Sequence, residues 1–415
     1  MTAQGSPVAV IVDVYTCSEP LLQGFLKAGA EVVQVRPRPE VAPAIPGMAY
    51  LASVEGADVG DLAARLAGYS PVAVVAGQEP DVPLADALAA KLGLAGNDPA
   101  RSLVRRDKFA MIEALREAGL HCADQFKSGD VDEVVGWALR LGRFPVVVKP
   151  LTSAGTDKVT VCRTAGEVRQ AASAIIGTAT IFDDPNDEVL VQSYLEGTEY
   201  VVDMVSVGGR RYTCGVWEYR KKLLHGKYNI YDTETILPHD EHPVPELIAY
   251  VDKALAALGI EHGSSHAEVI LTPDGPALVE VGARTGGNMQ PDFHDRCLGA
   301  NQADVAALSY VDPERFLAEY ADRTYRKLKE AWVYSTPTDL DGVVDHWDEA
   351  VLADIDALPS VFWKLIKAQP GGTITPTISL KTSTMKICLL ADDETQLLED
   401  YQRIQELKDK VFHLR

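Results

Sequence analysis

The sequence predicts a protein of the α/β and α+β class that is built from several units. Short apolar runs at residues 8–12, 31–35 and 72–76 alternate with helical patterns near residues 21–28 and 84–92, which is typical of a parallel sheet covered by helices. A chain of 415 residues is too long for one core, so we expect two to four units. No GxGxxG follows the first apolar run, which predicts a Rossmann-like sheet without a dinucleotide site.

The composition excludes several classes of function. Apolar residues at 47% and charged residues at 24% describe an ordinary globular protein. The net charge of −21 argues against nucleic acid or an anionic membrane as the main partner. The six cysteines show no CxxC or other metal-ligand spacing, which favours a reducing compartment. We find no signal peptide and no membrane-spanning run, and we expect a cytoplasmic protein.

The next segment carries two lysines that could bind phosphate oxygens. Residues 101–119 are predicted to form one amphipathic helix with Lys108 on its charged face. A strand at residues 144–149 ends in Lys149 and leads into the small-residue loop LTSAGTDK. Such a lysine and loop can hold phosphate oxygens, because small residues allow close backbone approach. Taken singly, each lysine is as readily explained by exposure to water.

Downstream of this loop, an apolar strand at residues 188–193 ends in Gln192-Ser193 and is followed by Tyr194-Leu195. This junction could offer backbone donors and acceptors to an adenine edge, and an ordinary hinge is the alternative. From about residue 313 the pattern becomes mixed, with strand candidates at residues 373–380 and 385–390 and a charged helix at residues 394–410.

The strongest signal is the segment HAEVILTPDGPALVEVGARTGGN. Two alternating apolar strands meet at Pro273-Asp274-Gly275, which predicts an antiparallel hairpin. Glu268 and Glu280 can then project from the same face of the hairpin. Two such carboxylates repel each other unless a cation lies between them, and a hard divalent ion suits oxygen ligands. The alternative is a surface carboxylate pair bridged by Arg284.

Residues around this hairpin are candidates for substrate contact. His266 shares the strand face of Glu268, although a structural histidine is an equal alternative. The basic and aromatic stretch at residues 217–231, which includes His225, suits a loop that meets an anion. That stretch and residues 284–294 are the expected walls of a substrate pocket. Backbone N–H groups at Gly286, Gly287 and Asn288 could bind a carboxylate.

The order of these motifs resembles the ATP-grasp superfamily of carboxylate–amine ligases. Lys108 in RRDKFAM, the VVVKP strand, the TSAGTDKV loop, VQSYLEGTEY and the HAEV…LVEVGARTGG hairpin follow one another over roughly residues 1–300. The GSSHAEV…ALVEVGARTGGN and VAGQEPDVPLADALAAKLGLAGN segments look most like the L-amino acid ligase branch, whose members join amino acids into dipeptides.

The resemblance implies four units and a set of site residues. The units are an N-terminal Rossmann-like domain (1–100), a lid subdomain with a linker helix (101–192), a large catalytic subdomain (193–310) and a C-terminal α+β portion (311–415). Magnesium would be held by Glu268 and Glu280, and Arg284 would stabilise the reacting centre. The residues implied to bind ATP are Lys108, Lys149, Ser153, Ala154, Gly155 and Lys158 at the phosphates, Gln192, Ser193 and Leu195 at adenine, and Glu199 near the ribose or on the substrate side.

The resemblance implies an ADP-forming ligase that activates the carboxylate of one amino acid and joins it to the amine of another, giving a dipeptide or γ-glutamyl product. ATP with one or two magnesium ions, or manganese, would be required. Gly282 stands where many family members carry an asparagine metal ligand, so the binding of a second metal ion is left open. Acyl transfer to a carrier protein, ring closure and a nucleotide-binding module without turnover are the alternatives. A homodimer is also left open.

Overall fold

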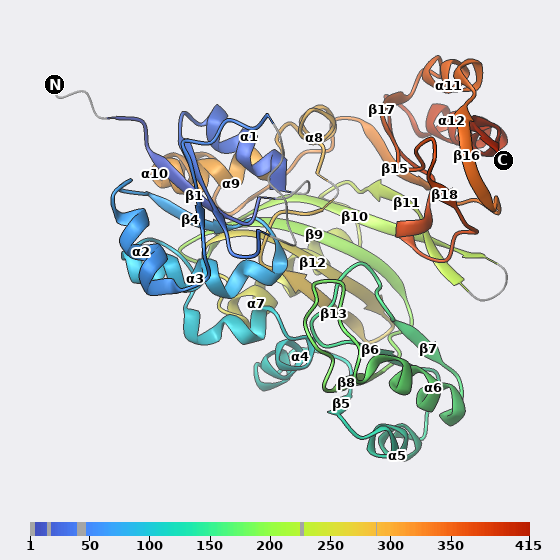
Figure 1. Ribbon diagram of the computed structural model, residues 1–415, viewed down its shortest axis with the longest axis horizontal. Helices are drawn as coiled ribbons and strands as arrows, with labels where there is room; N and C mark the ends of the chain where they lie inside the picture. The colour runs from blue at the N-terminus through green and yellow to red at the C-terminus, as the bar shows by residue number, and fades with distance from the viewer. Residues whose placement is uncertain (1–4, 15–17, 40–46, 225–227, 288) are drawn as a thin grey trace.

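The computed structural model describes residues 5–14, 18–39, 47–224, 228–287 and 289–415 (Figure 1). Within these residues the strands form four sheets. Figure 1 shows the N-terminal sheet, the lid and the C-terminal helices at three corners of the molecule, around a long central sheet. The candidate site lies on that central sheet.

The N-terminal sheet is parallel, with the strand order β3-β2-β1-β4, as the alternating pattern predicts. The strand β3 was not predicted, because Val54 is its one fully buried residue and no apolar run marks it. The strand order places the carboxyl ends of β1 and β4 side by side, at the crevice where such sheets often bind ligands. Glu79 follows β4 there. The elements are β1 (Val8–Val12), α1 (Glu19–Lys27), β2 (Glu31–Arg36), β3 (Ala52–Glu55), α2 (Val59–Ala67), β4 (Ala73–Ala76), the 3-10 turn η2 (Glu79–Asp81) and α3 (Val82–Leu92).

The single helix predicted over residues 101–119 is wrong. A 3-10 helix, η3 (Pro99–Arg105), is followed by a separate helix, α4 (Lys108–Glu117). The break falls at Asp107, which has an extended backbone and accepts a hydrogen bond from Ala110 N (2.8 Å) as the N-cap of α4. The break places Lys108 at the start of a helix rather than on its face.

The predicted lid subdomain contains an antiparallel sheet in the order β5-β8-β6-β7. Helices α5 and α6 pack on it through a core that includes Val134, Val146 and Val168. The predicted strand at residues 144–149 is β6, and it ends at Lys149 as expected. The elements are β5 (Gln125–Ser128), α5 (Val131–Leu141), β6 (Val146–Lys149), β7 (Thr160–Cys162), α6 (Ala165–Ile175) and β8 (Val189–Ser193).

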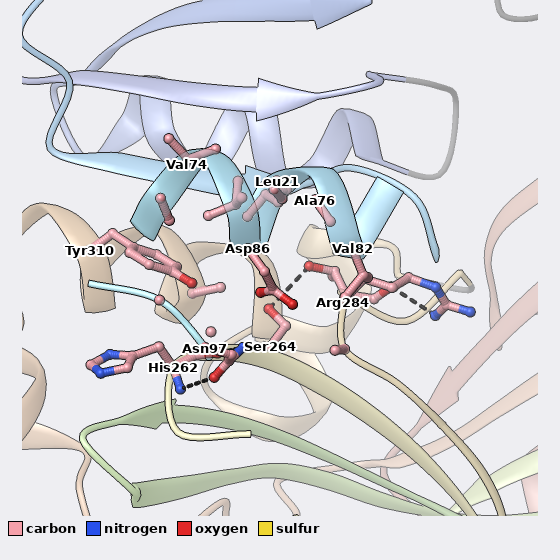
Figure 2. A pocket seen from close by; sticks show the side chains of 18 residues that line it. Leu21, Val74, Ala76, Val82, Asp86, Asn97, His262, Ser264, Arg284 and Tyr310 are labelled. Carbon is pink, nitrogen blue, oxygen red and sulfur yellow. Dashed lines mark hydrogen bonds between the residues drawn. The ribbon is translucent and has the colours of Figure 1, made fainter. Parts of the chain in front are cut away.

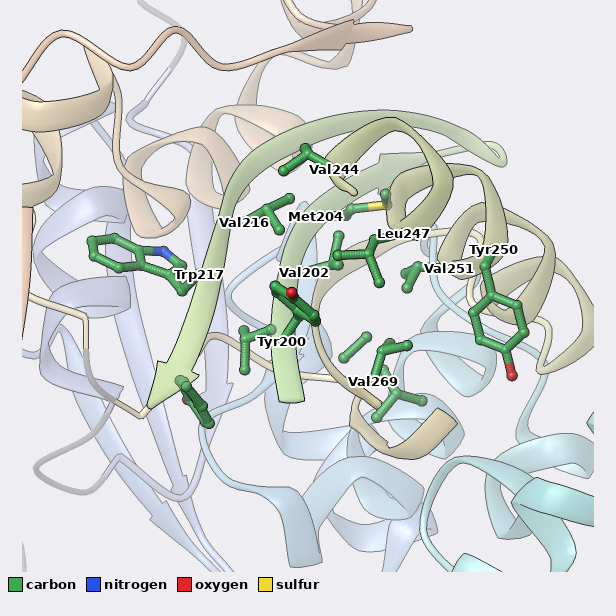
Figure 3. Packing of buried hydrophobic residues seen from close by; sticks show 14 of the residues in the cluster. Tyr200, Val202, Met204, Val216, Trp217, Val244, Leu247, Tyr250, Val251 and Val269 are labelled. Carbon is green, nitrogen blue, oxygen red and sulfur yellow. The ribbon is translucent and has the colours of Figure 1, made fainter. Parts of the chain in front are cut away.

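The central sheet has nine strands in the described part of the chain, ordered β13-β12-β9-β10-β11-β15-β19-β17, with β14 paired to β10. Helix α7 covers one of its faces, where Val244, Leu247 and Val251 pack on Val202 and Val216 (Figure 3). Alternate residues of the same strands face the other way. The strands are β9 (Thr198–Val207), β10 (Arg210–Leu224), β11 (Tyr228–Ile236), β12 (Gly263–Thr272), β13 (Gly275–Gly282), β14 (Arg323–Thr324), β15 (Glu330–Thr336), β17 (Val361–Ile366) and β19 (Met385–Ala391), and α7 is Val244–Ala257.

The basic and aromatic stretch at residues 217–231 is not the loop that its composition suggests. Its described residues lie in the paired strands β10 and β11, with Trp217 opposite Ile236 and Lys221 opposite Tyr231. Aromatic side chains suit a pleated, half-buried surface, and this preference explains the strand. His225 lies outside the described residues.

The C-terminal portion adds β15, β17 and β19 to the central sheet and packs helices on them. The strand predicted at residues 385–390 and the helix at 394–410 are confirmed as β19 and α12. The strand predicted at residues 373–380 is only the two-residue β18, followed by the 3-10 turn η4. The remaining elements are α8 (Pro291–Leu298), α9 (Gln302–Val311), α10 (Pro313–Glu319), β16 (Gly342–Trp347), α11 (Glu349–Asp356), β18 (Thr373–Ile374), η4 (Leu380–Thr382), α12 (Glu394–Leu407), η5 (Lys408–Val411) and β20 (Phe412–Leu414). None of the helices described has the length and apolar character to cross a membrane.

A buried arginine joins the N-terminal sheet to the central one. The side chain of Arg105 is 0% exposed and pairs with Asp86 of α3 (2.8 Å). It also donates to the carbonyls of Asp98 (2.6 Å) and Leu258 (3.2 Å). This network fixes the N-terminal unit, and therefore Glu79, relative to the central sheet.

We predict that Asp86→Ala lowers the free energy of unfolding by about 3–5 kcal/mol, because it leaves a buried charge without its partner. Thermal and urea unfolding measure this loss. The matched control is Asp61→Ala, which removes an exposed pair with Arg65 and should cost about 1 kcal/mol or less. Equal losses in the two variants would contradict the structural role of Arg105.

Candidate active site

The hairpin of β12 and β13 holds two glutamates face to face. Its turn is Pro273-Asp274, with Thr272 paired to Gly275, as predicted. Glu268 and Glu280 are direct partners in the antiparallel ladder. Directly opposite side chains share one face and lie close together. Both side chains are half-buried, so their mutual repulsion is only partly screened by water.

The electrostatics of the pair are asymmetric. Burial, together with the charges of Glu280 and Glu199, raises the pKa of Glu268 to about 8. Burial also opposes ionisation of Glu280, but the ammonium of Lys108, 2.5 Å away, outweighs it and lowers the pKa of that carboxyl. The charge of Glu280 is thus balanced by Lys108, while Glu268 is largely protonated at pH 7.

The two predicted lysines meet at this pair, although they come from different elements. Lys108 is buried at the start of α4 and donates to the carbonyl of Ser153 (2.7 Å) as well as pairing with Glu280. Lys149 is buried at the end of β6. Burial and the neighbouring charge of Lys108 lower the pKa of Lys149 to about 8. Two buried ammonium groups beside two carboxylates form a site that can accept an anion together with a cation.

The small-residue loop lies over Lys108. Ser153 is buried, and its hydroxyl donates to Asp157 (2.7 Å). The Ala154 carbonyl accepts a hydrogen bond from the backbone N–H of Asp157. Gly155 has φ +65°, a backbone conformation that favours glycine. Lys158 does not join the other lysines, because its ammonium donates to Thr178 Oγ1 (2.7 Å) and the Ala179 carbonyl (2.8 Å). Its predicted contact with phosphate stays a prediction.

The predicted adenine hinge lies at the end of β8. Gln192 donates to Gln125 (3.0 Å), and the hydroxyl of Ser193 accepts from Asp124 N (3.0 Å). Leu195 is half-buried in an otherwise exposed connection to β9. Glu199 accepts a hydrogen bond from Tyr231 (2.8 Å) and pairs with Lys221. The hinge side chains of Gln192 and Ser193 are therefore occupied by protein partners.

Arg284 takes the space that an asparagine at position 282 would need. A Cβ on Gly282 would lie 3.1 Å from Arg284 Cζ, so the glycine makes room for the guanidinium. Arg284 donates to the Thr285 carbonyl (3.0 Å) and pairs with Glu79 (3.2 Å). Glu79 was not singled out from the sequence. An acidic residue just after a strand of a parallel sheet was the signal that could have found it.

His266 is fixed by a carboxylate that the sequence reasoning also missed. Its Nδ1 lies 2.7 Å from Asp203, which is its partner residue on β9. Burial disfavours the charged ring, but Asp203 outweighs this effect and raises the pKa of His266. Asp203 interrupts the apolar run YVVDMVSV, a signal visible in the sequence. Gly286 closes over the pair, since a Cβ there would meet His266 Nδ1 at 3.0 Å.

One expectation about the backbone is corrected. The N–H of Gly286 does not face a substrate, because it donates to the buried side chain of Gln302 (2.9 Å). Gln302 in turn donates to the carbonyls of Met204 (3.1 Å) and Ser265 (2.8 Å), so it clamps this segment to the sheet. Gly287 is exposed, and Asn288 lies outside the described residues.

A cavity lies on the same sheet face, in a hollow of about 330 Å³ that includes open solvent. Both predicted walls contribute to it, with Trp217 and Tyr219 from one stretch and Met289 and His294 from the other. Its polar lining residues are Asp203, Glu234, His266 and His294. Burial lowers the pKa of His294 to about 4, so that ring is neutral at pH 7.

A second cavity lies between the N-terminal unit and the central sheet, in a hollow of about 480 Å³ that includes open solvent. Figure 2 shows it between the helix that carries Val82 and Asp86 and the start of β12 at Ser264, with Arg284 in the segment after β13. The segment 283–286 separates the two cavities, because residues 283–285 line this one and Gly286 lines the other. Arg284 thus stands between the site on the sheet face and the N-terminal unit.

The glutamate pair fits a magnesium ion. Two carboxylates held opposite one another, one of them forced toward protonation, supply hard oxygen ligands that a divalent cation would satisfy. Over the described residues, no group of three or more His, Cys, Asp or Glu side chains is arranged as a complete ligand set. Magnesium commonly takes only one or two carboxylates and completes its shell with phosphates and water.

The chain is similar to known proteins in both sequence and fold. Residues 142–292 match the model of the ATP-grasp domain. The chain is 31% identical to a dapdiamide A synthase of Enterobacter agglomerans over 98% of this chain and 97% of that protein. It is 25% identical to an L-arginine-specific L-amino acid ligase of Bacillus subtilis over 47% of each chain. A crystal structure of an L-amino acid ligase from Bacillus licheniformis shares the fold, with a TM-score of 0.78, 18% identity and coverage of 100% of this chain and 99% of that one.

The fold and the site define an ATP-grasp enzyme. The chain belongs to the ATP-grasp superfamily of carboxylate–amine ligases.

We predict that Glu268→Gln stabilises the metal-free protein at high pH. Because the folded pKa of Glu268 is raised from 4.5 to about 8, the wild type loses stability as the pH rises from 4.5 through 8. The glutamine carries no charge to bury. In the presence of a chelator, the free energy of unfolding of the variant should exceed that of the wild type by at least about 1 kcal/mol at pH 8.5. The difference should be smaller at pH 5. The exposed Glu399→Gln is the control for thermal unfolding, and an unchanged difference between the two pH values would contradict the pKa assignment.

We predict that Gly282→Ala lowers kcat by roughly tenfold or more, because even a small displacement of a positioned group is costly. The new methyl group would press on the guanidinium of Arg284 and displace it from Glu79. Steady-state assays of ADP release measure the loss. Gly166→Ala in α6, where the added carbon has its nearest neighbour at 3.8 Å, is the control. Full activity of Gly282→Ala would show that the position of Arg284 is not critical.

Proposed function

We propose that this protein is an ADP-forming L-amino acid ligase that joins the carboxylate of one amino acid to the amine of a second. The observation that carries the proposal is the direct opposition of Glu268 and Glu280, with the buried Lys108 and Lys149 beside them. This arrangement suits magnesium and a polyphosphate together. The named relatives, a dapdiamide A synthase and L-amino acid ligases, support an amide-forming reaction.

In the first step, a carboxylate oxygen of the substrate attacks the γ-phosphorus of ATP. A new O–P bond forms, the bond from that phosphorus to the β,γ-bridging oxygen breaks, and ADP leaves behind an acylphosphate. Lys108 would release Glu280 and hold phosphate oxygens together with Lys149. When bound by Glu268 and Glu280, magnesium would neutralise phosphate charge. The small-residue loop LTSAGTDK, which is the proposed phosphate loop, would exclude water that could otherwise hydrolyse the acylphosphate.

In the second step, the amine nitrogen of the other substrate attacks the acyl carbon. A C–N bond forms, the C–O bond to the phosphate breaks, and inorganic phosphate leaves as the nitrogen loses its proton. Arg284 would meet the negative charge that develops on the transferring groups, because its guanidinium lies against Gly282 and its charge acts on Glu280.

The cavity lined by Trp217, Met289 and Asp203 is the proposed amino acid site. It lies on the same sheet face as the glutamate pair, since His266, which lines it, is two residues from Glu268 on β12. Its aromatic and apolar wall would take a side chain. The carboxylates of Asp203 and Glu234 are the groups that would attract an ammonium.

An ADP-release screen over pairs of amino acids, with mass spectrometry of the products, tests the function. We expect ADP and a dipeptide or γ-glutamyl product to appear only when a carboxylate donor and an amine acceptor are both present. Glu280→Gln, which removes a metal ligand, is the inactive control. Product that forms only with a carrier protein, or ATP binding without turnover on any pair, would overturn the proposal.

The proposed setting is the cytoplasm, where free thiols such as those of Cys122 and Cys214 are stable. We also propose that the chain divides into units after residues 100, 192 and 310. A homodimer is proposed as well. Manganese is proposed to replace magnesium in the same site.

We predict that Arg284→Ala lowers kcat by roughly 100-fold or more while the affinity for ATP changes little, since a contact that strengthens only in the transition state affects turnover. Initial rates measure kcat, and calorimetric titration with a non-hydrolysable ATP analogue measures affinity. Equal losses in both quantities would reassign Arg284 to ground-state binding.

A further inference from the structure

Glu79 bridges two arginines that come from different parts of the chain. One of its oxygens lies 3.2 Å from Nη2 of Arg284, and the other lies 3.3 Å from Nη1 of Arg106. The side chain of Glu79 is only 7% exposed, so the bridge is largely shielded from water. Arg106 lies in the linker just before α4. The bridge therefore connects the catalytic arginine to the linker that leads to the lid.

Arg106 also faces the lid. Its guanidinium lies 5.2 Å from the ring centre of Phe182, and its Nη2 lies 3.7 Å from Asp184. Among the described residues, this buried Nη2 has no hydrogen-bond partner. A second arginine, Arg38 of the N-terminal unit, donates to the Phe182 carbonyl (3.2 Å). The lid thus touches the N-terminal unit and the linker at one point.

That point is a tight hairpin of the lid, residues 178–186, which we call the latch hairpin. Ala179 and Pro185 form a bridge, and Thr180 N donates to the Asp184 carbonyl (2.8 Å). The Thr180 hydroxyl accepts hydrogen bonds from Phe182 N (3.1 Å) and Asp184 N (3.2 Å). These bonds fix the conformation of the tip that meets Arg106.

The latch hairpin is joined to the proposed phosphate loop by Lys158. The ammonium of Lys158 donates to Thr178 and to the Ala179 carbonyl, at 2.7 and 2.8 Å. Ser153, at the other end of the same loop, accepts from Lys108. A continuous set of contacts therefore runs from the phosphate loop to the latch hairpin and on to Arg106.

We propose that Glu79 is a positioning residue that couples closure of the lid over ATP to the placement of Arg284. Phosphate binding draws in the loop, and Lys158 moves the latch hairpin with it. Asp184 then closes the 3.7 Å gap to Arg106, which locks Glu79 and, through Glu79, the guanidinium of Arg284. Glu79 touches neither substrate in this account. The inference rests on the proposed function, because Arg284 acts on the reacting centre only there.

The test combines kinetics with hydrogen exchange on the full-length protein. Glu79→Gln should lower kcat by roughly ten- to hundredfold, because a misplaced group loses that much, while the KM for ATP stays within about threefold. Asp184→Asn should give a smaller loss of kcat. Because both act through one set of contacts, the double variant should lose little more than Glu79→Gln alone. Losses that multiply would overturn the coupling.

Hydrogen exchange separates this inference from the proposed function. With magnesium and a non-hydrolysable ATP analogue, the wild type should gain protection at residues 178–186 and at residues 283–287. In Glu79→Gln, only residues 178–186 should gain it. Equal protection of both segments in the variant would overturn the proposal, and this holds even if no amino acid pair is turned over. Failure of the wild type in the ADP-release screen would instead contradict the ligase function.

Asp132→Asn is the matched control for both measurements. It removes an exposed ion pair with Arg169 between the two lid helices and touches neither the latch hairpin nor the loop. Its kcat and its exchange pattern should match those of the wild type. Thermal unfolding of every variant identifies a general loss of the fold, which would lower protection at both segments together.

Discussion

The site depends on one unfavourable contact, the placement of Glu268 and Glu280 directly opposite each other on an antiparallel ladder. Helix α7 buries the other face of the same strands, so neither glutamate can escape by rotating to the far side of the sheet. In the absence of a metal, Lys108 neutralises one carboxylate and burial keeps the other near its protonated form. A divalent cation that displaced this proton and the ammonium of Lys108 would supply both carboxylates with a shared positive partner.

The surrounding charges follow from that contact. Lys108 pairs with Glu280, and Lys149 has a pKa lowered to about 8 because it is buried beside another ammonium. Under the proposed function, each of these groups would gain an oppositely charged partner when magnesium and a polyphosphate bind together. A negatively charged protein can therefore bind an anionic nucleotide, because the local field at the hairpin is set by two buried lysines. Arg284, held by Glu79, completes this arrangement from the N-terminal side.

The sequence was informative where short-range rules determine the structure. The parallel N-terminal strands, the strand that ends at Lys149 and the hairpin at Pro273-Asp274 all follow from apolar periodicity and turn chemistry. The break before α4 was missed because Asp107 acts as a cap in a segment whose periodicity is continuous. Glu79 was missed because its role comes from contact with Arg284, 205 positions away in the chain. The hydrogen bond from Lys158 to the latch hairpin is likewise a tertiary contact that no local sequence pattern marks.

The central claim is that the opposed glutamates hold a divalent cation on the phosphates of ATP. The most direct measurement is a crystal structure with manganese and a non-hydrolysable ATP analogue, in which anomalous scattering locates the ion. We expect a peak about 2.0–2.4 Å from carboxylate oxygens of Glu268 and Glu280, with Lys108 moved from Glu280 to a phosphate oxygen. A peak elsewhere, with Lys108 still paired to Glu280 while the nucleotide is bound, would contradict the account.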